Sequence, residues 1–291
     1  MQPITTPDGR TIQVHEGGDP DGLPVLVCHG TPGDGSLYQP HVDDARARGI
    51  RLLGYDRPGY GGSSPQPGRS VADGARDVEA IADALGLERL AVWGLSGGGP
   101  HALACAALLA GRVVAVVSLA AVGPYGVEGL DWLDGMGEDN IEEFGAAVQG
   151  RDALGRYLDE KRSERLQGDA VQLRDELRTL LTPVDADALT GEFAEYVDES
   201  MRRALAPAVD GWLDDDLAFA EPWGFDLAAI ETPVQLWHGE HDQFVPIAHG
   251  RWLAARIPDV DARLSPDDGH LTLATNRVPE VHAWLVERLQ A

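Results

Sequence analysis

A buried strand that passes directly into a helix through a glycine-flanked serine restricts the possible folds of this chain more than any other feature. Residues 90–93 form an apolar run typical of a strand, and the Ala- and Leu-rich residues 101–110 favour a helix. The residues between them, 94–100, read Gly-Leu-Ser-Gly-Gly-Gly-Pro. The pattern predicts a strand, a sharp turn and a helix, with Ser96 at the apex of the turn.

The turn contains Gly-x-Ser-x-Gly, with Gly94 and Gly98 two residues either side of Ser96. A serine held in a strained conformation between a strand and a helix leaves no space for Cβ atoms at these two positions. The unpaired N–H of Gly97, at the helix start, would face negative charge that develops beside Ser96. We interpret Ser96 as a nucleophile. A phosphate-binding turn is the alternative, disfavoured because no Lys-Ser or Lys-Thr pair follows the glycines.

Strand and helix patterns alternate along most of the chain. Runs that predict strands occupy residues 11–14, 24–28, 51–55, 90–93, 113–121, 233–239 and 262–264. Helical patterns occupy residues 36–49, 71–85, 101–110, 247–256 and 271–289. Continuous apolar strands separated by helices favour an α/β fold with a mostly parallel, doubly wound sheet.

The alternation stops between residues 124 and 225, where only helical patterns are found. Helices are expected at 139–149, 152–166, 171–181, 185–205 and 207–219. This segment holds 25 acidic and 9 basic residues and therefore most of the excess negative charge. We predict an inserted all-helical cap domain over 124–225, and a core domain formed by 1–123 and 226–291.

The charge balance limits the partners of the protein. The formal net charge of −25 excludes a basic nucleic-acid surface and repels an anionic membrane. No signal-peptide pattern or apolar run of membrane-spanning length is found, so we expect a cytoplasmic protein. Cys28 and Cys105 are expected as buried free thiols, and no metal or cofactor is expected because no metal-ligand spacing occurs. A small molecule is the expected partner, and no oligomeric state is indicated.

A serine nucleophile needs a base to remove its proton and an acid to orient that base. Asp242 follows the strand expected at 233–239, and His270 follows the strand expected at 262–264. Because the carboxyl ends of parallel strands meet at one edge of a sheet, both side chains would project from the same edge as Ser96.

With these motifs, the sequence resembles the α/β-hydrolase fold serine hydrolases from about residue 24 to its end, except for the helical insertion, which lies where that family has its variable cap. The resemblance implies that Ser96 is the nucleophile, Asp242 in Gly-x-x-Asp-x-x-x-Pro the acid, and His270 in Asp-Gly-His the base. It also implies an oxyanion hole formed by the backbone N–H groups of Gly97 and Thr31.

Two loops complete the resemblance. Residues 29–32 read His-Gly-Thr-Pro and supply Thr31, while residues 56–61 read Asp-Arg-Pro-Gly-Tyr-Gly and match a structural motif of the family. His29 is expected to shape its loop, because its strand precedes that of the nucleophile. His238 and His241 lie too close to Asp242 in sequence to be its partner.

Residues 29–33 differ at one position from the His-Gly-Gly-Pro-Gly loop of proline iminopeptidases, which hold a substrate amino group with cap acids. In that alternative, Glu192 and Glu195 on an expected helix would bind the amine. The serine turn disfavours it, because those enzymes have Gly-Gly-Ser-Trp-Gly there. The alternative is that the two residues lie on an acidic helix face that contacts only water and has no binding role.

Three tryptophans in or beside the insertion, Trp132, Trp212 and Trp223, are candidates for an apolar pocket wall. We predict a serine esterase that cleaves a small neutral or cationic carboxylic ester through an acyl-enzyme on Ser96. A proline iminopeptidase-like aminopeptidase is one alternative. A non-catalytic ligand-binding module of the same fold is another, since fold alone does not guarantee activity.

Overall fold

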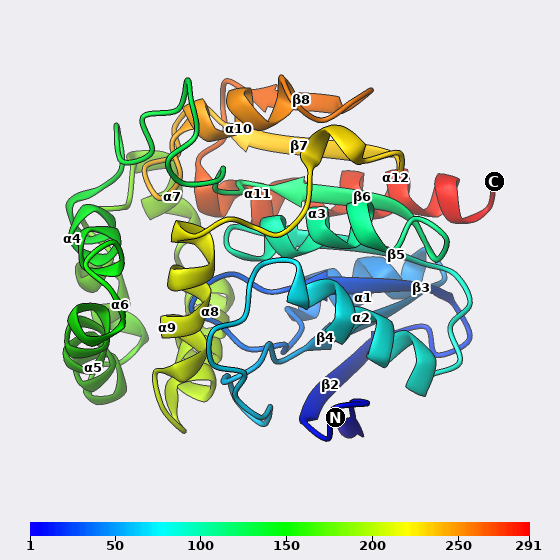
Figure 1. Ribbon diagram of the computed structural model, residues 1–291, viewed down its shortest axis with the longest axis horizontal. Coiled ribbons are helices and arrows are strands. Elements are labelled where there is room, and N and C mark those ends of the chain that lie inside the picture. The colour runs from blue at the N-terminus through cyan, green and yellow to red at the C-terminus, as the bar shows by residue number, and fades with distance from the viewer.

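The computed structural model describes residues 1–291 and is built around an eight-stranded sheet (Figure 1). The strands are β1 Gln2–Thr5, β2 Thr11–Gly18, β3 Leu23–Cys28, β4 Ile50–Tyr55, β5 Leu90–Leu95, β6 Val113–Leu119, β7 Val234–Gly239 and β8 Asp261–Ser265. They lie in the order β1-β2-β4-β3-β5-β6-β7-β8, and all pairs are parallel except those that β2 makes with β1 and β4. The expected α/β-hydrolase fold is confirmed.

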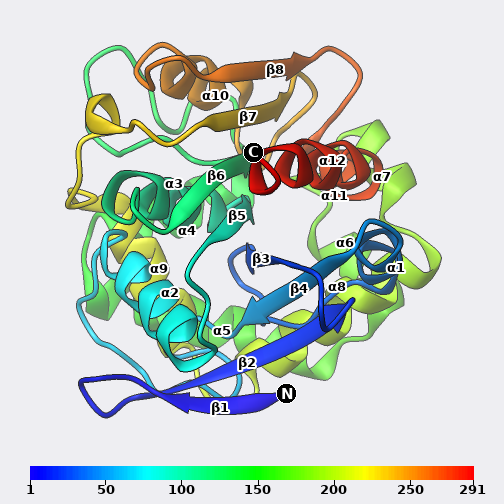
Figure 2. The ribbon, with the colours of Figure 1, turned by 90° about the vertical axis from the view of Figure 1, so that its right-hand side faces the viewer.

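Helices cover both faces of the sheet (Figure 2). Their bounds are α1 Gln39–Ala47, α2 Asp73–Ala84, α3 Gly98–Leu108, α10 Ile247–Ala254, α11 His270–Asn276 and α12 Val278–Leu289. Helices α2, α3 and α10 pack on one face, and α1 and α12 on the other. Covered on both sides, β7 is buried at every position, which explains its continuous apolar character.

The chain between β6 and β7 contains no strand and forms six helices, which we call the helical layer. They are α4 Glu138–Ala147, α5 Arg151–Gln167, α6 Ala170–Glu176, α7 Pro183–Ala188, α8 Gly191–Leu205 and α9 Asp210–Ala220. The layer lies beyond the carboxyl ends of the parallel strands, at the left of Figure 1. Ser96, Asp242 and His270 follow the carboxyl ends of β5, β7 and β8, so all three lie at this same edge of the sheet.

Three expected elements differ from the observed ones. The helix expected at 185–205 is two helices, α7 and α8, separated where Gly191 has φ +52°, a conformation that favours glycine. The helix expected at 171–181 ends at Glu176. Strand β1 was not expected, because this edge strand is mostly exposed and shows no alternation of apolar residues. None of the helices has the length and hydrophobicity needed to cross a membrane.

Candidate active site

The turn at Ser96 is fixed by backbone hydrogen bonds. Ser96 has φ +54°, a strained value for a residue with a side chain. Its N–H donates to the Leu119 carbonyl over 2.8 Å, and its own carbonyl accepts the N–H of Gly99 over 2.8 Å. The end of β6 and the start of α3 therefore hold the backbone of the serine in one orientation.

The flanking glycines are required by close packing. A Cβ on Gly94 would lie 2.2 Å from the carbonyl oxygen of Gly98, and one on Gly98 would lie 2.0 Å from that of Cys28. Both distances are far shorter than any real Cβ contact. The structure thus gives the physical reason for the Gly-x-Ser-x-Gly pattern.

His270 and Asp242 form a hydrogen-bonded pair at the same edge of the sheet. His270 Nδ1 lies 2.8 Å from Asp242 Oδ2, and Asp242 Oδ1 accepts the N–H of Val245 over 2.8 Å. The ring of Phe244 stacks on the imidazole with 4.5 Å between centroids. Ser96 and His270 line one cavity, so the structure brings the three predicted residues into a single region.

The pKa of His270 reflects opposing effects. Burial lowers it, because the charged imidazolium is costly away from water. The charge and the hydrogen bond of Asp242, together with the charge of Asp185, outweigh this effect and raise the pKa above the ordinary 6.5. Asp242 therefore both orients the ring and stabilises its protonated form.

A second carboxylate holds His270 through its backbone. Asp185, fully buried on α7, accepts the N–H groups of His270, Leu271 and Thr272 over 2.8, 2.7 and 3.1 Å. These are the first N–H groups of α11, which lack partners within the helix. Sequence patterns give no signal of this role, because Asp185 lies 85 residues before His270, at the start of a stretch predicted as one continuous helix.

Thr31 and Gly97, the two residues predicted to form the oxyanion hole, lie next to each other. A Cβ on Gly97 would be 2.3 Å from Thr31 Oγ1, so the two residues are in direct contact. Neither the N–H of Thr31 nor that of Gly97 donates to another group of the chain. Both N–H groups are therefore unpaired within the chain, as a role in anion binding requires.

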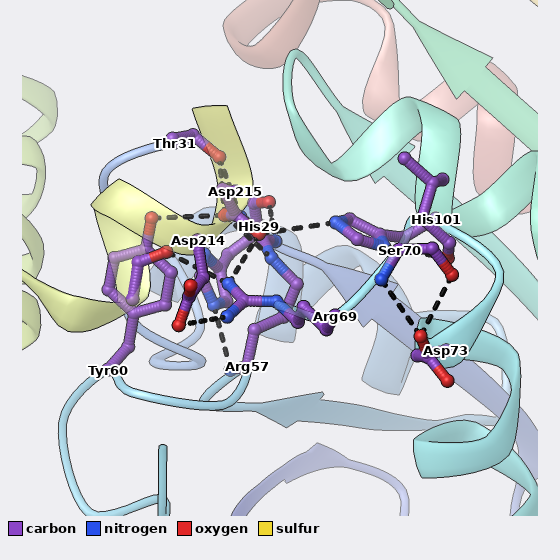
Figure 3. Close-up of polar contacts among 12 residues, drawn as sticks. His29, Thr31, Arg57, Tyr60, Arg69, Ser70, Asp73, His101, Asp214 and Asp215 are labelled. Carbon is purple, nitrogen blue, oxygen red and sulfur yellow. Dashed lines mark hydrogen bonds and ion pairs between the residues drawn. The ribbon is translucent and has the colours of Figure 1, made fainter. Parts of the chain in front are cut away.

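The side chain of Thr31 is held by a buried ion pair (Figure 3). Its Oγ1 donates to Asp215 Oδ2 over 2.8 Å and accepts from Arg57 Nη2 over 2.8 Å. Arg57 and Asp215 are themselves 2.7 Å apart and almost fully buried. The arginine comes from the predicted structural loop 56–61, whereas the aspartate comes from α9 of the helical layer.

Asp215 collects further partners, as Figure 3 shows. It accepts from Arg69 Nη2 over 2.7 Å and from the Tyr60 hydroxyl over 3.0 Å, and His101 Nε2 lies 3.4 Å away. Burial by itself raises the pKa of Asp215, but Arg57 and Arg69 hold it well below the ordinary value. This network joins α9 to the loop of the candidate oxyanion hole, and sequence patterns gave no signal of it.

A cavity of about 480 Å³ is lined by Ser96, His270, Thr31 and Gly97. Trp212 lines it, as predicted for a pocket wall, whereas Trp132 and Trp223 do not. Trp132 donates to the Gly123 carbonyl over 2.6 Å, and Trp223 packs beside Phe225. These two tryptophans are buried away from the cavity.

The acids predicted for the peptidase alternative lie elsewhere. Glu192 and Glu195 are exposed on α8, and neither lines the cavity. The prediction failed because helical spacing does not show which face of α8 packs against its neighbouring helices α5 and α6. Six other carboxylates of the helical layer line the cavity: Asp139, Glu143, Glu164, Asp175, Glu176 and Asp216.

The remaining histidines near the site make local contacts. His29 Nδ1 bonds the Gly30 carbonyl over 2.7 Å, and its Nε2 accepts the N–H of Arg57, so it shapes its loop as predicted. His238 Nε2 bonds the Val245 carbonyl over 2.7 Å and lies 3.7 Å from Asp242. His241 is exposed.

Comparisons with known proteins identify the family of the chain. Residues 24–276 match the family described as alpha/beta hydrolase fold. The chain is 30% identical over 286 residues to the non-heme chloroperoxidase of Streptomyces lividans, a match that covers 97% of this chain and 96% of the relative.

Solved structures share the fold. The bromoperoxidase of Bacillus anthracis superposes with a TM-score of 0.73 at 22% identity, and both chains are covered completely. A thermophilic esterase of Thermogutta terrifontis superposes with a TM-score of 0.69 at 21% identity, again over the full length of both chains. At these identities the likeness concerns the fold.

Proposed function

Because the chain belongs to the alpha/beta hydrolase fold family, we propose that it is a serine hydrolase that cleaves a small carboxylic ester. One observation carries the proposal: the strained Ser96, the His270–Asp242 pair and two free N–H groups surround one cavity. This combination supplies a nucleophile, an oriented base and an anion-binding pair of donors.

In the proposed mechanism, His270 removes the Ser96 proton as Oγ attacks the ester carbonyl. The N–H groups of Thr31 and Gly97 stabilise the oxyanion, and Asp242 stabilises the imidazolium. His270 then protonates the departing alcohol. Water, activated by the same histidine, releases the acid from Ser96 and restores the enzyme.

The helical layer is proposed to act as the cap of this enzyme, within residues 124–225. It covers the cavity and supplies lining residues from several of its helices, among them Phe144, Trp212 and Phe219. Half of the residues that line the cavity are hydrophobic, which favours small, partly apolar acyl or alcohol parts. Six carboxylates line the cavity against three basic side chains, Lys161, Arg165 and Arg178, so polyanionic substrates are disfavoured.

The name of the Streptomyces relative favours a second candidate, in which hydrogen peroxide replaces water as the acceptor. The acyl-enzyme would then pass its acyl group to the peroxide oxygen, giving a peracid and free Ser96, with the peroxide proton taken by His270. The same residues serve both reactions, so the acceptor alone distinguishes them.

A substrate comparison tests the proposal. Short-chain 4-nitrophenyl esters and a prolyl arylamide with a free amino end are assayed side by side, with and without hydrogen peroxide and a peracid-detecting dye. We expect fast ester cleavage, little arylamide cleavage, and labelling of the Ser96 peptide by a fluorophosphonate. Preferential arylamide cleavage would support the aminopeptidase alternative, and no turnover or labelling would support a ligand-binding module.

A further inference from the structure

A second helix of the helical layer binds the loop that carries Thr31. We call residues 29–36, between β3 and α1, the oxyanion loop. Its residue Asp34 is buried, and Oδ1 of its carboxylate accepts the hydroxyl of Ser200 over 2.8 Å. The other oxygen, Oδ2, accepts Arg203 Nε over 2.7 Å. Ser200 and Arg203 lie one turn apart on α8, so Asp34 connects the loop to this helix.

More hydrogen bonds join the same two segments. The N–H of Asp34 donates to Ser200 Oγ over 3.1 Å, so these residues bond through backbone and side chain. Arg203 Nη2 donates to Ser36 Oγ over 2.8 Å, and the Tyr196 hydroxyl donates to the Ser36 carbonyl over 3.0 Å. Tyr196, Ser200 and Arg203 are spaced by four and three residues, which places them on one face of α8. This face of the helix therefore binds the end of the oxyanion loop.

The turn that contains Thr31 lies directly against this connection. A Cβ on Gly33 would lie 3.2 Å from the Gly30 carbonyl oxygen and 3.5 Å from Ser200 Oγ. The turn therefore folds back on itself beside Ser200. Because Asp34 follows Thr31 by only three positions, a shift of Asp34 relative to α8 also moves the Thr31 N–H.

The oxyanion loop also contacts the sheet. The N–H of Gly35 donates to Asp56 Oδ1 over 2.8 Å, and a Cβ on Gly35 would lie 2.3 Å from the carbonyl carbon of Tyr55, at the end of β4. The loop contains no helix or strand, so the hydrogen bonds of regular secondary structure do not fix its path. Its position depends instead on its contacts with the sheet and with the helical layer.

The helix that binds the oxyanion loop also forms a wall of the cavity. Phe193, Val197 and Met201 of α8 line the cavity together with Ser96 and Thr31. These three side chains of α8 are apolar and are spaced by four residues, so they form one stripe along the helix. The position of α8 therefore affects both the shape of the cavity and the loop that carries the Thr31 donor.

We propose that Asp34 is a positioning residue, because it fixes the Thr31 N–H relative to Ser96. Through its bonds to Ser200 and Arg203, it makes α8 of the helical layer complete the oxyanion hole. Asp34 does not line the cavity, so it acts through the loop and not on the reacting atoms. A donor stabilises an oxyanion only within a narrow range of positions, so a shift of the donor lowers kcat. This inference rests on the proposed hydrolase function.

Steady-state kinetics of Asp34→Asn with 4-nitrophenyl butyrate test the proposal. Asparagine has nearly the same size, but its amide nitrogen cannot accept the N–H of Arg203. We expect kcat to fall about tenfold, with a change in KM of less than about twofold. Glu199→Gln is the matched control, because Glu199 bonds the same arginine over 3.0 Å but is exposed and lies outside the loop. It should leave kcat unchanged.

Two inhibitors separate the position of the donor from general damage to the cavity. With butyl trifluoromethyl ketone, Ser96 Oγ adds to the carbonyl carbon, its proton passes to His270, and the carbonyl oxygen becomes an oxyanion. Butyl methyl ketone has the same carbon chain and stays a ketone. In Asp34→Asn, Ki for the trifluoromethyl ketone should rise about tenfold, and Ki for the methyl ketone should change less than about twofold. An equal rise for both inhibitors would overturn the proposal.

Circular dichroism and the melting temperature show whether Asp34→Asn is folded. If it is not, Ser200→Ala serves the same comparisons with the same expected changes, because it removes only the hydroxyl between the loop and α8. A folded variant with native kcat, or an equal loss in Glu199→Gln, overturns the role of Asp34 and leaves the hydrolase function standing. A native protein that cleaves no ester overturns both.

Discussion

Two carboxylates hold His270, one through its ring and one through its backbone. Asp242 bonds the ring at Nδ1, whereas Asp185 bonds the backbone at the start of α11. The first contact fixes the tautomer and the second fixes the place of the residue relative to the helical layer. Both carboxylates favour the protonated imidazole.

A pH profile tests these contacts. The base acts only when neutral, and its pKa is raised above 6.5, so kcat/KM should fall as the pH drops through a midpoint above 6.5. Asp185→Asn removes a charge that raises this pKa, so the midpoint should move to lower pH. Asp187→Asn, an exposed position on the same helix, is the control and should leave the profile in place. An identical profile in Asp185→Asn would contradict the electrostatic role.

Thr31 offers a second test at this scale. Thr31→Val keeps the backbone N–H and the shape of the side chain but removes the hydroxyl bound by Asp215 and Arg57. We expect kcat to fall about tenfold with a smaller change in KM, because the oxyanion donor is less well placed. Thr31→Ser, which retains the hydroxyl, should recover most of the loss in steady-state assays. A Val variant with native kcat would show that the hydroxyl does not position the donor.

At the scale of elements, α9 connects the helical layer to the site. Its consecutive residues Asp214, Asp215 and Asp216 are all buried, yet their surroundings differ. Asp214 accepts the N–H of Gly68, Asp215 binds two arginines, and Asp216 is a hydrogen-bonding neighbour of Glu143 on α4. One short acidic run thus connects α9 to three different parts of the molecule.

Removing Asp215 should destabilise the protein strongly. Asp215→Ala leaves Arg57 and Arg69 buried without their partner, a change that typically costs about 3–5 kcal/mol. Urea unfolding measures the loss. Glu221→Ala, an exposed acid just after the same helix, should change the free energy of unfolding by less than about 0.5 kcal/mol. An equally small change for Asp215→Ala would mean that the network contributes little.

Glu143 links stability to pH with a defined sign. Its pKa is about 7 in the folded chain against an ordinary 4.5, so the folded state keeps a proton that the unfolded chain has released. This group therefore lowers stability progressively as the pH rises from about 4.5 to about 7. Glu143→Gln should raise the free energy of unfolding by about 1–2 kcal/mol at pH 8 and little at pH 4.5. The exposed Glu142→Gln is the control, and equal gains in both would refute the account.

The sequence predicted the fold class and most sheet elements because their signals are local. Ser96, Asp242 and His270 were predicted for a related reason: each follows a stretch of the sequence that predicts a strand. Asp185 and Asp216 were not found, because their partners lie on other elements far along the chain. Helical periodicity identifies a helix but not the direction its buried face takes against its neighbours.

For the whole molecule, the net charge of −25 is concentrated in the helical layer that covers the cavity. Negative charges held this close together repel one another and lower the stability of the folded state. Added salt screens charges beyond about 10 Å at 0.1 M. The melting temperature should therefore rise when NaCl is increased from about 10 mM to about 500 mM at pH 7.5. A melting temperature that falls would mean that surface ion pairs, such as Arg51 with Glu16, outweigh the repulsion.

The measurement that tests the account most directly is ester hydrolysis by Ser96→Ala, compared with the native protein. A Cβ is kept at the strained position, so circular dichroism and the melting temperature should stay close to native values. We expect kcat/KM to fall by about 10³-fold or more, because only oxyanion binding and proximity remain. A folded Ser96→Ala protein that retains native turnover would contradict the assignment of the nucleophile and the function built on it.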